Sequence, residues 1–110
     1  MEKLTVAEAR KIDMVDYLSS LGFQVTKIQG EDYWYFSPFR DERTPSFKIN
    51  RRSNIWYDHG SGDGGNIIDF GILYHRADVR GFLELLTRDY RQSDFSFHPP
   101  LKKDNNISSV

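Results

Sequence analysis

The chain has 110 residues and a formal net charge of −1, which suits one domain and excludes a uniformly basic nucleic-acid-binding protein. It has no cysteine, which excludes a disulfide scaffold and a zinc site built from thiolates. Its apolar runs are short and acidic residues interrupt its N-terminal segment, so we expect no membrane association, no signal peptide and a cytoplasmic location.

Residues 6–20 are predicted to form the first helix. Thr5 and Glu8 have the spacing of a capping box, in which each side chain accepts a hydrogen bond from the other's backbone amide. Apolar residues then recur at helical spacing, and Gly22 supplies a left-handed stop. The plain interpretation of this helix is that it packs against a core.

From Phe23 onward the pattern changes to the period of two that is typical of strands. The segments that fit it are 24–28, 32–37, 46–51 and 54–58. The loop 38–45 holds two prolines and four charged residues, which is too irregular for a strand. These segments predict an antiparallel meander.

Two more helices are predicted after the strands. Asn66 can cap a helix over 67–75, and Asp78 can cap a second one that ends near Tyr90. Residues 93–110 have no periodicity and are expected to be a linker or tail that leads to a further domain. The predicted domain therefore spans residues 1–92.

Two stretches carry most of the functional information. One contains Thr44-Pro45-Ser46-Phe47, and the other contains Gly62-Asp63-Gly64-Gly65-Asn66 followed by Asp69-Phe70. At this spacing, over about residues 8–90, they resemble the zinc-ribbon (Cys-His-Cys-Cys) domain at the N-terminus of bacterial DnaG-type DNA primases and their phage and mobile-element relatives. The predicted fold is α+β: an antiparallel, zinc-ribbon-like sheet of three to five strands with one N-terminal and two C-terminal helices.

The zinc ligands of that family are missing. The resemblance places the four ligand positions at Ser37, Arg40, Asp58 and Ser61. A structural zinc site needs four thiolate or imidazole ligands, so we expect a metal-free domain with no cofactor. We predict an Arg40–Asp58 ion pair across this position, completed by the hydroxyls of Ser37 and Ser61.

The glycine-rich loop 60–65 has two interpretations. It lacks the lysine of a phosphate-binding P-loop and the context of a dinucleotide fingerprint. Its amides precede a helix and could bind an anion weakly. We favour the alternative, in which the glycines permit a tight turn from strand to helix.

A basic cluster lies in the predicted sheet. Residues 40–52 include five basic and two acidic side chains. Strand alternation predicts that Ile55 and Tyr57 face the helices with Phe47 and Ile49, which leaves Lys48 and Trp56 on the open face. Cations beside aromatic rings suit single-stranded nucleic acid, although a solvated charged hairpin explains the same pattern. The predicted binding residues are Arg43, Lys48, Arg51, Arg52, Trp34 and Trp56.

The resemblance implies a noncatalytic DNA-binding module of a primase-like replication or mobile-element protein. Such a module engages single-stranded DNA template and positions it for a downstream catalytic domain or a helicase. The alternative is a protein-interaction module that has lost both zinc and DNA binding. A stand-alone enzyme has little support, because His59, His75 and His98 are scattered and no acid–base group is evident. No catalytic residue is therefore predicted.

Overall fold

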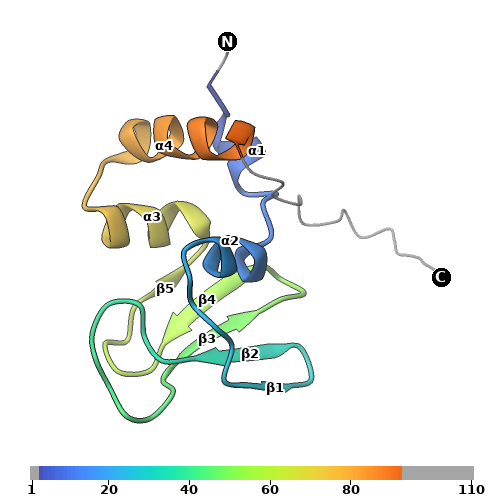
Figure 1. Ribbon diagram of the computed structural model, residues 1–110, viewed down its shortest axis with the longest axis vertical. Coiled ribbons are helices and arrows are strands. Elements are labelled where there is room, and N and C mark those ends of the chain that lie inside the picture. The colour runs from blue at the N-terminus through green and yellow to red at the C-terminus, as the bar shows by residue number, and fades with distance from the viewer. Residues whose placement is uncertain (1–2, 93–110) are drawn as a thin grey trace, which may run out of the picture.

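Helices lie on one side of a five-stranded antiparallel sheet in the computed structural model of the chain, which describes residues 3–92 (Figure 1). The helices are α1 (Val6–Ala9), α2 (Met14–Ser20), α3 (Ile67–His75) and α4 (Val79–Gln92). The strands, adjacent in chain order, are β1 (Lys27–Gln29), β2 (Asp32–Tyr35), β3 (Phe47–Asn50), β4 (Ile55–Asp58) and β5 (Gly64–Gly65). The predicted α+β class and antiparallel sheet are confirmed. The predicted tail at 93–110 lies outside the described residues, within which no helix is long and apolar enough to cross a membrane.

The prediction of a single helix over residues 6–20 is wrong, because the helix is interrupted between α1 and α2. The Thr5–Glu8 capping box is present, but Asp13 then caps a second helix by accepting from the Asp16 amide at 3.2 Å. The Asn54 side chain, only 7% exposed, holds the break open. It accepts from the backbone amide of Met14 at 2.9 Å and donates to the carbonyl of Ile12 at 2.8 Å. A side chain 40 residues away therefore satisfies backbone groups that the break exposes.

Gly22 ends α2 as predicted. Its φ is 95°, and the amide of Phe23 donates to the carbonyl of Leu18 at 3.0 Å. The amide of Gly22 donates in turn to the carbonyl of Ser19 at 3.0 Å, which completes a Schellman motif. A left-handed residue is required here, and glycine adopts that conformation without a Cβ clash.

The start of α3 is also as predicted. The Asn66 side chain accepts from the amide of Ile68 at 2.8 Å, and Asp69 accepts from the amide of Asn66 at 2.9 Å. One turn later, a Cβ at Gly71 would collide with the ring of Phe82 on α4. The helix-weakening glycine in α3 therefore allows α4 to pack closely against it.

The sheet register decides which aromatic rings reach the surface. Trp56 lies opposite Ile49, and Tyr57 lies opposite Lys48. Residues directly opposite each other share a face, so Trp56 joins the core at 2% exposed, whereas Ile55 and Tyr57 are 48% and 42% exposed. The predicted orientation of β4 is therefore wrong. Alternation within a strand does not say which set faces the core; the turn at 51–54 sets this by placing Trp56 opposite Ile49.

Aromatic rings hold the loop 38–45 against the core. The ring centroid of Phe39 lies 6.0 Å from Phe47, 5.7 Å from Trp56 and 5.4 Å from Phe70. The loop thus has an apolar anchor directly before Arg40. That anchor fixes the start of the long Arg40 side chain beside the end of β4.

Candidate nucleic-acid interface

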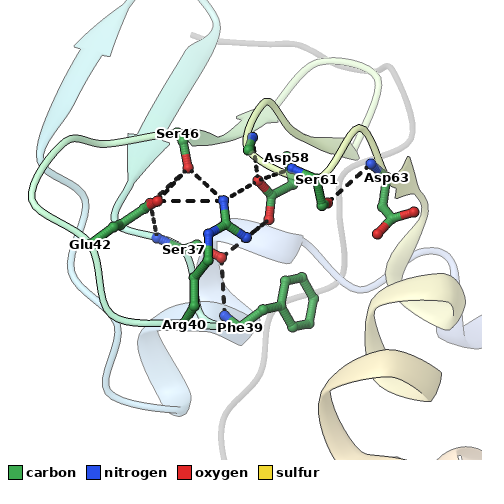
Figure 2. Close-up of polar contacts among 9 residues, drawn as sticks. Ser37, Phe39, Arg40, Glu42, Ser46, Asp58, Ser61 and Asp63 are labelled. Carbon is green, nitrogen blue, oxygen red and sulfur yellow. Dashed lines mark hydrogen bonds and ion pairs between the residues drawn. The ribbon is translucent and has the colours of Figure 1, made fainter.

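The four positions predicted to correspond to zinc ligands come together in space. Ser37 and Arg40 lie after β2, and Asp58 and Ser61 lie at the end of β4 and beyond it (Figure 2). The carboxylate of Asp58 is at the centre and is 0% exposed. The Arg40 guanidinium donates to both of its oxygens, from Nη1 to Oδ2 at 2.9 Å and from Nη2 to Oδ1 at 2.7 Å. The predicted ion pair is confirmed, in the bidentate geometry that gives such pairs their directionality.

Further donors complete the coordination of Asp58. The Ser37 hydroxyl donates to Oδ2 at 3.2 Å, and the amides of Gly60 and Ser61 donate to Oδ1 at 2.8 and 3.3 Å. The predicted role of the Ser61 hydroxyl is wrong. That hydroxyl accepts from the amide of Asp63 at 3.2 Å, because the tight turn directs the Ser61 backbone, rather than its side chain, toward Asp58.

Glu42 and Ser46 extend this group, which we call the Asp58 cluster (Ser37, Arg40, Glu42, Ser46 and Asp58). The Ser46 hydroxyl donates to Glu42 Oε1 at 2.7 Å and accepts from Arg40 Nη2 at 3.0 Å. Glu42 Oε1 also accepts from the amide of Ser37 at 2.7 Å. Sequence analysis missed both residues, although Ser46 belongs to the Thr-Pro-Ser-Phe motif and Glu42 lies two residues after Arg40.

Both carboxylates of the Asp58 cluster are stabilised in their ionised form. Burial alone would raise the pKa of Asp58, but hydrogen bonds from Arg40 and from the Gly60 amide outweigh it and hold that pKa below its ordinary value. Burial likewise opposes ionisation of Glu42, and hydrogen bonds from Ser46 and Ser37 bring its pKa below the ordinary value. Neither group is therefore suited to general acid–base chemistry at neutral pH.

These shifts predict acid sensitivity. A carboxyl group whose pKa is lower when folded stabilises the folded state above its unfolded pKa, which is about 4 for Asp and Glu. That stabilisation is lost as the pH falls from there through the folded pKa values of Asp58 and Glu42. We expect the melting temperature (Tm), followed by circular dichroism, to fall across this range. An Asp58→Asn variant should show a shallower fall, and equal slopes for the two proteins would contradict the assignment.

The residues at the former ligand positions do not fit zinc. They offer two hydroxyls, one guanidinium and one carboxylate that is already engaged. Among residues 3–92 no group of three or more histidine, cysteine or acidic side chains is placed to hold a metal ion.

Because structural zinc sites normally contribute folding free energy, adding a chelator tests directly whether the domain depends on zinc. We expect excess EDTA, and separately added zinc chloride, to leave Tm unchanged within about 1 °C, well below the effect of 1 kcal/mol; a drop with EDTA would reveal a metal.

The sheet face opposite the helices carries a row of cations and rings. The register aligns Lys27, Trp34, Lys48 and Tyr57 across four adjacent strands, and we call this row the open face. The Nζ atoms of Lys27 and Lys48 lie 5.3 and 5.7 Å from the centroid of the Trp34 ring. Both distances are within the range of cation–π attraction. The His59 ring stacks on Trp34, with centroids 5.3 Å apart and planes at 21°.

The six predicted binding residues have different positions. Trp34 and Lys48 lie on the open face. The prediction that Trp56 shares this face is wrong, because the Trp56 ring is buried in the core. Arg51 ties the hairpin turn to the N-terminal segment, donating to Asp13 at 2.7 Å. Exposed Arg52 lies 3.8 Å from Glu31, and Arg43 is exposed on the loop 38–45. Nucleic-acid binding by Arg43, Arg51 and Arg52 stays a prediction.

Sequence analysis missed Lys27, Tyr57 and His59 as part of this surface. The signal that could have found the first two is pairing across short turns. The turn between β1 and β2 aligns Lys27 with Trp34, and the turn between β3 and β4 aligns Tyr57 with Lys48. His59 gave no such signal, because it follows the last residue of β4 and its ring direction depends on the turn.

The five-stranded sheet, the packing of α3 against α4 and the four ligand positions that come together define a zinc-ribbon domain. In this domain the Arg40–Asp58 ion pair lies where the metal would be. A family model described as CHC2 zinc finger matches residues 2–98, and the chain belongs to that family. It is 38% identical to a DNA primase of Treponema pallidum over 62% of this chain, and 34% identical to one of Synechocystis over 91% of it.

A solved structure shows the same fold. The crystal structure of the Aquifex aeolicus primase (zinc-binding and RNA polymerase domains) matches 96% of this chain with a TM-score of 0.67 and 28% sequence identity. The chain spans 12% and 16% of the length of the two primases named above, and 24% of the Aquifex chain. The shared region is therefore a small part of much longer proteins.

Proposed function

We propose that this chain is a metal-independent module of a DNA primase that binds single-stranded template DNA through the open face. The observation that carries the proposal is the row in which lysines alternate with aromatic rings. Lysines follow phosphates, and bases stack on rings whatever their sequence, each stack being worth about 1–3 kcal/mol. The kinship with DNA primases supplies the biological setting.

The dimensions of the row suit a flexible strand. Trp34 on β2 and Tyr57 on β4 are two strands apart, which is roughly 9–10 Å, with Lys48 between them. Lys48 lies 3.8 Å from Asp32, so a phosphate must compete with this ion pair. Such partly exposed pairs are worth about 0–1 kcal/mol, which is a small obstacle.

The domain itself is proposed to be noncatalytic. Nucleotidyl transfer uses clustered carboxylates with free oxygens to hold Mg²⁺. Asp58 and Glu42 lie close together and are engaged by Arg40, Ser37 and Ser46. Asp13 and Asp16 also lie close together and are engaged by Arg51. Polymerisation would therefore belong to a separate catalytic domain, to which this module presents the template, as the primase relationship suggests.

Fluorescence anisotropy of a labelled oligothymidylate of about 12 nucleotides, a length within the usual site range, tests the proposal. We expect binding that weakens steeply between low and moderate salt. Lys27→Glu/Lys48→Glu should bind more than about tenfold more weakly, because both phosphate contacts are reversed in charge. Arg80→Glu/Arg88→Glu makes the same change in net charge, but on α4 and away from the open face. This control should bind within about twofold of the native chain. Binding that is absent at low salt would refute the proposal.

Apolar side chains exposed on the same side of the sheet favour a second candidate function, the binding of a protein partner. Phe36 and Ile55 are 45% and 48% exposed, and together with Tyr57 they could anchor a protein partner, such as the catalytic domain or a helicase. Binding through such anchors depends little on salt, so the salt series that tests DNA binding also separates the two functions.

A further inference from the structure

His59 occupies the place on the open face where a base would stack. Its ring stacks on that of Trp34, with centroids 5.3 Å apart and planes inclined at 21°, and meets the Tyr57 ring edge-on with centroids 4.7 Å apart. Its backbone is fixed by a hydrogen bond from its amide to the carbonyl of Ser46 at 2.8 Å. The residue is exposed, so its side chain has solvent into which it can turn.

We propose that His59 is a gate on this surface: its imidazole covers Trp34 in the free protein, and a nucleobase of the bound single strand displaces it. This inference rests on the proposed DNA binding and adds the residue that regulates access to the stacking site. A planar heteroaromatic ring stacked on an indole makes the contact that a base would make, so the two occupants exclude each other on this side of the ring.

The Trp34 indole gives a reason why displacement is easy. Its Nε1 is buried without a hydrogen-bond partner in the part of the chain that the structure describes. A covered N–H without a partner disfavours the arrangement that covers it. The His59 imidazole does not accept from this N–H, whereas a bound strand brings acceptor oxygens that can.

The charges around the Trp34 ring favour a nucleotide, which carries a phosphate, over the His59 side chain. Lys27 and Lys48 lie close to the Trp34 ring, with their Nζ atoms 5.3 and 5.7 Å from its centroid. A nucleotide adds a phosphate that both ammonium groups attract, whereas His59 adds no negative charge. The same two lysines thus bias the exchange toward nucleic acid.

Two measurements on the full 110-residue chain test the gate. The first is proton NMR of the His59 ring, whose resonances should be shifted upfield by the rings of Trp34 and Tyr57 and should return toward free-histidine positions when oligothymidylate is added. The second is anisotropy with His59→Ala, which should bind oligothymidylate roughly threefold to tenfold more tightly. The gain is expected because binding to this variant does not have to break the aromatic stack of His59 on Trp34.

Matched controls separate the gate from general surface effects. Gln29→Ala, a neutral change on exposed β1, should leave the affinity unchanged. An abasic oligodeoxynucleotide should bind the native chain and His59→Ala equally, because it has phosphates but no ring to stack. A tighter abasic complex with His59→Ala would overturn base displacement as the cause of the gain.

The outcomes distinguish the gate from the function on which it rests. Native binding to oligothymidylate, with no gain in His59→Ala and unmoved His59 resonances, would overturn the gate and leave DNA binding intact. Absence of salt-dependent binding by both proteins would overturn both proposals.

Discussion

Replacing Asp58 by alanine is expected to lower the free energy of unfolding by about 3 kcal/mol. The carboxylate is 0% exposed and accepts hydrogen bonds from Arg40, Ser37 and two backbone amides. Alanine leaves those donors without their acceptor and a cavity at the end of β4. For a domain of this size the change corresponds to a fall in Tm of roughly 12–24 °C, measured by thermal denaturation.

Asp63→Ala is the matched control for this prediction. Asp63 lies five residues further along the same segment with an exposed side chain, and the Ser61 hydroxyl contacts its backbone amide, which the substitution keeps. We expect a change within about 0.5 kcal/mol, the usual range for such surface positions. Similar melting curves for Asp58→Ala and Asp63→Ala would mean that the Asp58 cluster does not stabilise the fold in place of zinc.

Trp56→Ala is expected to have the largest effect of any single substitution discussed, about 4 kcal/mol of unfolding free energy. The ring is 2% exposed, stacks on Phe47 with centroids 5.4 Å apart, and donates from Nε1 to the carbonyl of Asn66 at 2.9 Å. The substitution therefore removes core volume and also a contact at the start of α3. Domains of this kind are stable by about 5–15 kcal/mol, so the variant should unfold at markedly lower urea concentration.

The second tryptophan provides the contrast. Trp34→Ala should cost only about 1 kcal/mol of stability, because Trp34 is half-buried and lies outside the core, while weakening binding of oligothymidylate by the loss of one stacking platform. Urea unfolding followed by far-ultraviolet circular dichroism avoids dependence on tryptophan emission. Equal destabilisation by the two substitutions would contradict the register that buries Trp56 and places Trp34 on the open face.

The Asp58 cluster was largely predictable from the sequence because motif spacing locates it. The resemblance to the primase zinc ribbon places the ligand positions relative to Thr44-Pro45-Ser46-Phe47 and to the glycine-rich turn, and opposite charges at two of them indicate a pair. The Ser61 hydroxyl was wrongly placed, because its direction depends on the backbone path of the turn, which composition does not determine. Local capping signals were reliable for a similar reason: the Asn66 and Asp69 side chains act within one helical turn.

Long-range contacts account for what the sequence could not show. The break between α1 and α2 depends on Asn54, which meets Met14 from across the fold. The orientation of Trp56 depends on its partner Ile49 rather than on the alternation within β4. His59 became part of the open face because a turn directs its ring onto Trp34. In each case the deciding neighbour is distant in the sequence or set by turn geometry, and period-based reasoning considers neither.

The Arg40–Asp58 pair also alters the chemical vulnerability of the ribbon. Zinc-bound thiolates can be oxidised stepwise to sulfenic, sulfinic and sulfonic acids, and a ribbon that loses its metal in this way loses its fold. The chain has no cysteine, and the guanidinium and carboxylate that hold this position together undergo no such oxidation. The open face built on this scaffold is expected to keep its shape under peroxide stress or zinc starvation, conditions in which a metal-bound ribbon loses its metal.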